Sequence, residues 1–263
     1  MLGDKSKYLE HIKDTDQILT MRKVLDKVEK TLITHTVEFT DFLDPYQRRL
    51  CYSFLNRFME VNYHEEGGLE GAERKIIVIY PHYMDKSYLE SYIGAIRLDG
   101  SFRFNDLNHR DYLGAILGLG IKREKIGDIL VHEKYTQVIL HKDIIDYVIL
   151  NLKKIGKEPV KVKEIKLHEI NRPSEKFKEI IRTVASLRID SLLSAAYGIS
   201  RSGSLSYIKN GRVKLNWQPI DTASYKANEG DMISVRGKGR FKLYKVLGET
   251  RKGRQRVAIK IFK

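Results

Sequence analysis

Ser200, Arg201 and Ser202 are consecutive residues whose side chains could together hold a phosphate group. Ser is a preferred N-cap residue, and the run that follows ends at Asn210-Gly211, so we expect a helix to begin at Ser200. A helix N-terminus presents free backbone N–H groups and the positive end of the helix dipole. Two hydroxyls and a guanidinium would add hydrogen bonds to a bound anion. These residues therefore predict a phosphate-binding site.

Further basic residues follow this helix, and we expect them to extend the positive surface. They are Lys209, Arg212, Lys214, Arg236, Lys238 and Arg240. Beyond Arg236 the chain interleaves Lys and Arg with Phe241 and Tyr244, a pattern that suits a groove following a nucleic-acid backbone. Apolar residues alternate with basic ones in this last hairpin, which predicts that the basic residues Lys242, Lys245, Arg256 and Lys260 are exposed.

Two features near this helix allow two interpretations each. Arg188 could contact a nucleic acid, but with Asp190 it could equally form a structural ion pair that locks two helices together, and the ion pair is favoured for Asp190. Trp217 stands at a predicted hairpin turn. Its ring is either a platform on which an unpaired base stacks or a lid on a small core, and the sequence leaves both open.

The charge of the chain is divided unevenly. Residues 182–263 contain 18 Lys and Arg against 5 Asp and Glu, whereas residues 1–181 contain 30 against 29. A basic surface gains affinity for nucleic acid because phosphates release their counterions when they are neutralised. A surface evolved only for solubility could carry either sign over the whole chain. The asymmetry therefore favours a nucleic-acid-binding segment at residues 182–263.

Two patterns resemble parts of enzyme sites but are incomplete. His109-Arg110-Asp111 is similar to a kinase catalytic loop, yet Ile116 stands where that loop needs an Asn for the metal. Gly118-Leu119-Gly120 could begin a dinucleotide-binding loop, yet Arg123 replaces its third glycine. We therefore expect neither activity.

A third pattern, Arg97-Leu98-Asp99, resembles the start of the active loop of pseudouridine synthases. Phe102 stands where that loop has Ser or Thr. The single cysteine, Cys51, cannot form an internal disulfide or a cysteine-based zinc cage. We expect no catalytic residues, no metal and no cofactor, hence a protein that is not an enzyme.

The elements that would position these residues fall into three parts and give an α+β fold class. Residues 1–68 form an N-terminal helical subdomain, because apolar residues recur every three or four positions over 18–32 and 46–61. In residues 72–168, strand-like segments alternate with helix-like ones, and the first is a buried strand at 76–80. This order predicts a ferredoxin-like α/β sandwich. A polar linker at 171–174 leads to the third part, 182–263, which has two helices, several strands and an extra β-hairpin.

The chain contains no apolar run long enough to span a membrane, and its first residues lack the apolar core of a signal peptide. We expect a cytoplasmic protein that is monomeric when free.

Residues 188–233 resemble the αL RNA-binding motif first described in ribosomal protein S-four. The matching positions are Arg188-Ile189-Asp190, Ser200-Arg201-Ser202, Ile208, Gly211, Val213, Leu215-Asn216 and Gly230-Asp231-Met232-Ile233. Trp217 departs from the pattern, because many members have Gly there. The resemblance implies that the third part is an αL RNA-binding domain.

Residues 109–129, from His109 to Ile129, resemble the characteristic segment of the YlmH family of bacterial proteins. That family has the same order of a helical part, an α/β part and a terminal αL domain. The resemblance implies a ribosome-associated RNA-binding protein, with ribosomal RNA, the large ribosomal subunit and tRNA as partners. It also implies a link to division-gene neighbourhoods and to the rescue of large subunits that carry stalled peptidyl-tRNA.

Taken together, these patterns favour a non-enzymatic RNA-binding adaptor that docks on structured, ribosomal RNA. Two alternatives stay open. One is an RNA-modifying enzyme such as a pseudouridine synthase, which would need a convergent acid, base or cofactor site. The other is a nucleic-acid-binding scaffold linked to cell division, since phosphate contacts alone do not distinguish RNA from DNA.

Overall fold

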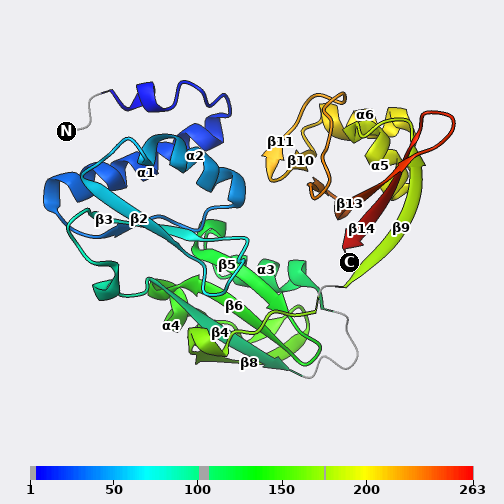
Figure 1. The fold of residues 1–263 in the computed structure, drawn as a ribbon. Coiled ribbons are helices and arrows are strands. Elements are labelled where there is room, and N and C mark those ends of the chain that lie inside the picture. Colours follow the sequence, from blue (N-terminus) through cyan, green and yellow to red (C-terminus); the bar gives the residue numbers. More distant parts are fainter. Residues whose placement is uncertain (1–3, 101–106, 175, 263) are drawn as a thin grey trace. The chain divides into compact units, whose positions relative to one another are not determined.

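The computed structural model describes residues 4–100, 107–174 and 176–262 (Figure 1). The chain folds into two compact units, Met1–Pro173 and Ser174–Lys263, and each is described by itself. The division between them falls in the polar segment 171–174 that the sequence indicates as a linker.

The first unit contains helices and two antiparallel sheets. Its α-helices are α1 (Thr15–Thr34), α2 (Pro45–Leu55), α3 (His109–Leu117) and α4 (Ile145–Asn151). Its strands are β1 (Glu38–Phe39), β2 (Val61–Glu66), β3 (Ile76–Pro81), β4 (Ile93–Gly100), β5 (Ile126–Val131), β6 (Tyr135–His141), β7 (Lys154–Ile155) and β8 (Glu158–Ile165).

Helices α1 and α2 cover a three-stranded sheet whose order is β1-β3-β2. The side chain of Asp14 caps α1, and Asp44 forms a capping box with Gln47 at the start of α2. The buried faces of both helices pack against Ile77 and Ile79 of β3. This core excludes water from one face of the sheet.

This part of the fold differs from the prediction of helices alone. Helix α2 ends at Leu55, and Val61 is the first residue of β2. Phe58 and Val61 are buried in the same core as α2, so their spacing marks an apolar face that continues beyond the helix. Strand β3 pairs with β1 and β2, so the expected boundary at residues 68–72 lies between two strands of one sheet.

The second sheet has the order β5-β6-β4-β8-β7, and its neighbouring strands are antiparallel. From β4 to β8 the chain runs strand, helix, strand, strand, helix, strand, with the short β7 added before β8. This is the ferredoxin-like arrangement that the sequence predicts, and it begins at β4. Helices α3 and α4 cover one face of this sheet.

Strand β3 is the central strand of the three-stranded sheet and is buried on both faces, as its continuous apolar run predicts. The face turned away from α1 and α2 packs against the second sheet in a cluster that contains Phe42, Ile76, Val78, Tyr80, Ile93 and Ile139. The first unit is therefore layered as helices, sheet, sheet and helices.

The second unit is a six-stranded antiparallel sheet with two helices on one face (Figure 1). The helices are α5 (Ile189–Tyr197) and α6 (Arg201–Lys209). The strands are β9 (Phe177–Val184), β10 (Val213–Leu215), β11 (Gln218–Pro219), β12 (Met232–Val235), β13 (Gly239–Glu249) and β14 (Gln255–Phe262), and their order in the sheet is β11-β10-β12-β13-β14-β9.

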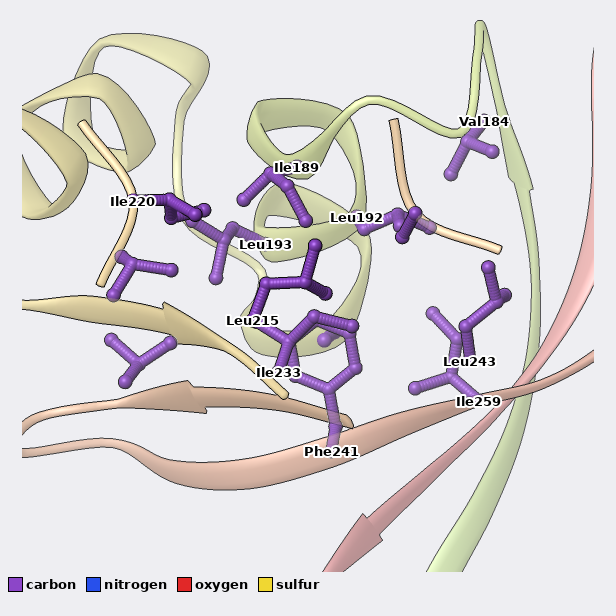
Figure 2. Close-up of a cluster of buried hydrophobic side chains, with 14 of the residues drawn as sticks. Val184, Ile189, Leu192, Leu193, Leu215, Ile220, Ile233, Phe241, Leu243 and Ile259 are labelled. Atoms are coloured by element: carbon purple, nitrogen blue, oxygen red, sulfur yellow. The ribbon is translucent and has the colours of Figure 1, made fainter. Parts of the chain in front are cut away.

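The core of the second unit lies between α5 and the sheet (Figure 2). Ile189 and Leu192 of α5 lie against Phe241, Leu243 and Ile259 of the sheet, and all five are fully buried. Because side chains alternate across a strand, the residues between these buried positions point to the other face of the sheet. The helices thus leave that second face of the sheet uncovered by the core.

The sequence predicts most elements of this unit. Helix α5 ends at Gly198, which adopts a φ of 66° that a side chain would disfavour, and α6 begins after Ser200. The hairpin of β13 and β14 is also confirmed. The segment 180–184, ambiguous between helix and strand, belongs to β9, so the expected start of this part at residue 182 lies inside a strand that pairs with β14.

Candidate nucleic-acid interface

The N-terminus of α6 has the capping geometry that its sequence predicts. The Ser200 hydroxyl accepts a hydrogen bond from the backbone N–H of Gly203 at 3.1 Å, and it lies 3.0 Å from the Ser202 hydroxyl. Both serines are exposed. The cap uses the Gly203 N–H and one lone pair of the Ser200 hydroxyl, while the hydroxyls of Ser200 and Ser202 remain together at the surface.

Arg201 is held by a buried carboxylate. Its Nη2 donates to Asp190 Oδ2 at 3.0 Å, while Arg188 donates to the same carboxylate through Nε and Nη2, each at 3.1 Å. The Asp190 side chain is 3% exposed, whereas those of Arg188 and Arg201 are 36% and 65% exposed. We call Arg188, Asp190 and Arg201 the arginine clamp.

The arginine clamp joins α5 to α6, which confirms the ion pair expected for Asp190 and adds Arg201 to it. The ion pair uses one of the five N–H donors of Arg201. The other donors point from a mostly exposed side chain. The carboxylate therefore fixes the direction of Arg201, whose side chain stays 65% exposed.

Burial and hydrogen bonding have opposite effects on the pKa of Asp190. Removal from water would raise the pKa of this carboxyl, but the hydrogen bonds from Arg188 and Arg201 outweigh burial and lower it below its ordinary value. The hydrogen bond from the backbone N–H of Ser191 also lowers the pKa of Asp190. The carboxylate is therefore charged throughout the physiological pH range.

A second group of cations lies at the other end of α6, about 13 Å away along a nine-residue helix. Arg212 follows α6 and Arg236 follows β12, and the Arg236 N–H donates to the Arg212 carbonyl at 2.8 Å. Lys209 ends α6, and Lys238 lies in the turn after Arg236. All four side chains are exposed, and we call them the basic edge.

Lys214 and Arg240 occupy a different surface from the basic edge. Both pair across Ser234 of β12, Lys214 from β10 and Arg240 from β13. Their neighbours Val213 and Phe241 face the core, so Lys214 and Arg240 lie on the opposite face of the sheet. The predicted basic residues thus form two groups and not one continuous stripe.

Trp217 stands in the two-residue turn that joins β10 to β11. Asn216 and Trp217 adopt φ values of 46° and 67°, the left-handed conformation that a type I′ turn requires. The Asn216 side chain donates to Asp231 at 2.7 Å and accepts from the Met232 N–H at 2.9 Å, which holds the turn. Trp217 is half-buried and lies outside the core cluster, which favours a platform over a lid.

Sequence reasoning missed part of the aromatic surface and misplaced another part. Phe241, expected to alternate with cations in a groove, is fully buried in the core. Phe177 and Phe262 were not considered, although they lie on the uncovered face of the sheet near Tyr244 and form a ring pair with centroids 6.3 Å apart. The signal that could have found them is the alternation of strands β9 and β14.

The residues of the incomplete enzyme patterns have structural partners. Asp111 accepts the backbone N–H of Asn108 at 2.8 Å in a capping box at the start of α3. Asp99 pairs with Arg97 Nε at 2.8 Å on β4. Phe102 of the pseudouridine-synthase comparison lies outside the described residues. Within the described ranges, no group of three or more His, Cys, Asp or Glu could hold a metal ion.

Comparison with known proteins first defines the class of the second unit. The family model described as "S4 domain" matches residues 187–233, which span α5, α6 and β10 to the first residues of β12. Two further models match the first unit: "YlmH, N-terminal" over residues 16–84 and "Putative RNA-binding domain in YlmH" over residues 90–169. The limits of these matches agree with the pairing of β3 in the N-terminal sheet.

The relatives of the whole chain then define its family. It is 34% identical over 242 residues to "Ribosome-associated protein quality control protein P2" of Bacillus subtilis (strain 168), which covers 92% of this chain and 91% of that protein. The chain belongs to the YlmH family. A solved structure, "Cell division protein ylmH from Streptococcus pneumoniae", is 25% identical with a TM-score of 0.51, and the similarity covers 60% of this chain and 97% of that one.

The described helices were also compared with the needs of a membrane span. Among them, none is long and apolar enough to cross a bilayer.

Proposed function

We propose that this chain is a non-enzymatic RNA-binding protein that docks on structured ribosomal RNA of the large subunit and acts as an adaptor in ribosome quality control. Docking uses the second unit, through the start of α6 with the arginine clamp, through the basic edge, and through Trp217. The adaptor assists large subunits that carry stalled peptidyl-tRNA, so tRNA is a second partner, and it works in the cytoplasm as a monomer.

The observation that carries this proposal is the concentration of positive charge on an S4-type unit. Residues 182–263 hold 18 basic residues against 5 acidic ones, and the four cations of the basic edge are exposed together. Such a surface neutralises phosphates of any folded RNA. The relative named for ribosome-associated quality control is similar over nearly the whole chain, which supports the ribosome as the source of that RNA.

An adaptor fits the remaining residues better than an enzyme does. The carboxylates in the enzyme-like patterns serve a helix cap and an ion pair on a strand. A general acid or base needs a group within reach of a substrate and a pKa tuned to its task. Asp111 and Asp99 have structural partners instead, which favours binding over catalysis.

The test is co-sedimentation of the full-length protein with purified ribosomal subunits. The variant Arg212→Ala with Arg236→Ala removes two cations of the basic edge. Its matched control, Lys134→Ala with Lys157→Ala, removes two exposed cations of the first unit. We expect the intact protein to sediment with large subunits and the edge variant to bind more weakly, with a salt dependence smaller by about 1.4 to 1.8 log units per log unit of salt.

The control variant should behave as the intact protein does. Equal weakening by both double variants would show that binding follows total charge and that the basic edge has no special role. Binding to small subunits in preference to large ones would contradict the choice of partner.

The name of the solved relative supports a second candidate, a nucleic-acid-binding scaffold linked to cell division. The two candidates differ in where the protein is found in cells. A fluorescent fusion of the full-length chain should follow the ribosomes. If it gathers at the division site in cells whose ribosomes lie elsewhere, the scaffold is the better description.

A further inference from the structure

The face of the second unit's sheet that lies opposite α5 and α6 has an unusual composition. Its outward positions on β9, β10, β13 and β14 alternate with core-facing positions such as the partly buried Ile180 and the buried Leu243 and Ile259. We call this surface the outer sheet face. The charged residues at its outward positions are Lys214, Arg240, Lys242, Lys245, Arg256, Lys260 and Glu179.

Three aromatic rings lie among these charges. Phe177 of β9 is directly opposite Phe262 of β14, and their rings meet at 63° with centroids 6.3 Å apart. Tyr244 lies on β13 at a bulge that keeps it on the same face. Phe177 and Tyr244 are 40% and 44% exposed. Apolar rings that cluster at a surface often mark a binding site.

The cations are placed directly on the rings. Lys260 Nζ lies 3.5 Å from the centroid of Tyr244 and 4.4 Å from that of Phe177, so one ammonium stands between two rings. The Arg240 guanidinium lies 5.4 Å from the centroid of Phe262. These contacts hold the rings and cations together at the surface.

We propose that the outer sheet face binds an unpaired RNA strand, with bases stacked on Phe177, Tyr244 and Phe262. On binding, the Lys260 ammonium leaves the ring faces it covers and contacts a phosphate beside Lys242. A single strand offers both flat bases for rings and a phosphate for each cation, whereas a paired helix hides its bases. An open antiparallel sheet with exposed rings is a known form of single-strand platform. The lone acid at these positions, Glu179, leaves the surface strongly positive.

This site is distinct from the docking surface of the proposed function. The arginine clamp and the basic edge belong to α6 and its flanking turns, whereas the three rings belong to β9, β13 and β14. Those strands lie outside residues 187–233, which the S4 domain matches. The second unit would therefore bind folded RNA at one surface and an unpaired segment at another.

The test measures binding of full-length protein to a labelled 12-nucleotide oligoadenylate and to an abasic strand of the same length and charge. We expect the oligoadenylate to bind more tightly, because the abasic strand has no bases to stack. Tyr244→Ala and Phe177→Ala should each weaken oligoadenylate binding by about 5- to 150-fold without changing its salt dependence. Lys260→Ala should reduce the slope of log affinity against log salt by about 0.7.

Control variants distinguish loss of an aromatic ring from loss of folding. Tyr244→Phe retains the ring and should bind as the intact protein does. Tyr225→Ala removes a tyrosine that is 49% exposed in the loop before β12, away from this face, and should leave oligoadenylate binding unchanged. Circular dichroism should show that each variant is folded at the temperature of the binding assay, because none of the replaced side chains lies in the buried core.

Several outcomes would overturn the proposal. Equal binding of oligoadenylate and abasic strand would show that the face recognises charge alone. If Tyr244→Ala and Tyr225→Ala weaken oligoadenylate binding equally, the rings of the outer sheet face do not form the binding site. If Tyr244→Ala leaves RNA binding intact but changes the mass in sedimentation, the face is a protein interface. The intact protein and the Arg212→Ala/Arg236→Ala variant are also measured with a folded RNA hairpin. The hairpin tests the basic edge and the oligoadenylate tests the outer sheet face, so the failure of one proposal can be told from the failure of the other.

Discussion

Replacement of Asp190 by Ala should destabilise the second unit far more than the removal of an exposed acid. The carboxylate accepts a backbone N–H from Ser191 at 2.9 Å and three hydrogen bonds from Arg188 and Arg201 at 3.0 to 3.1 Å. Through these arginines the carboxylate links the start of α5 to the start of α6. Its loss leaves two guanidiniums without their anchor and one amide in a buried turn without its acceptor.

The expected cost follows from the exposure of each partner. Hydrogen bonds to a charged group contribute about 1.5 to 3 kcal/mol when sheltered, and exposed ion pairs contribute about 0.2 to 1 kcal/mol. Arg201 is mostly exposed and belongs to the second class, whereas Arg188 binds through two nitrogens and is half-buried. With the buried Ser191 amide added, we expect a loss of about 3 kcal/mol in the free energy of unfolding.

The assay uses the single tryptophan of the chain. Trp217 lies in the second unit, so its fluorescence during urea unfolding reports that unit alone. A loss of about 3 kcal/mol should lower the urea midpoint by roughly 1 to 3 M. Asp221→Ala, which removes an exposed acid of the same unit, should change the unfolding free energy by less than about 0.5 kcal/mol.

The dependence on pH gives an independent check. Because the folded pKa of Asp190 is lowered, its stabilisation is present above the unfolded pKa and is lost as the pH falls through the folded pKa. The difference between the intact protein and Asp190→Ala should therefore shrink in acid. A midpoint for Asp190→Ala no lower than that for Asp221→Ala at neutral pH would refute the idea of a clamp.

Two further predictions concern a buried histidine and the strained turn. Burial and the nearby Lys125 lower the pKa of His141, so the unfolded chain takes up a proton at a higher pH than the folded one. The unfolding free energy of the first unit should therefore fall by up to about 1.4 kcal/mol per pH unit below pH 6.5, and His141→Gln should flatten this dependence. Reaction of the buried Cys51 with a thiol reagent reports the unfolding. Trp217→Gly and Trp217→Ala both lose the ring, but only Gly relieves the left-handed φ, so thermal melts followed by circular dichroism should show a higher unfolding free energy for Trp217→Gly than for Trp217→Ala by about 1 kcal/mol.

Local signals predicted the helices of the second unit because their ends are specified by single residues. Ser200 caps α6 and Gly198 ends α5 in the conformation that glycine favours. The N-terminal sheet could not be predicted in the same way. The apolar spacing of Phe58 and Val61 fits a helix, but the pairing of β2 with β3 decides the conformation, and that partner is distant in the chain.

The candidate site was predictable in composition but not in arrangement. Charge counting located the basic segment, and motif spacing located Arg188, Ser200 and Arg201. Neither could show that Asp190 accepts from both arginines, because that contact depends on how α5 packs against α6. The division of Arg236 and Arg240 between two surfaces depends likewise on strand register.

The few acids of the basic segment explain how so much positive charge is tolerated in one small fold. Asp190 holds two arginines, and Asp231 accepts from Asn216 and from the Asn228 N–H. Glu229 accepts the Val246 N–H at 2.9 Å. Each of these acids is used to fix a helix junction, a turn or a strand end, where a hydrogen bond to a charged group contributes most. Because these acids are engaged within the unit, the excess of 18 basic residues over 5 acidic ones leaves a repulsion that the fold carries, and a bound polyanion would reduce it.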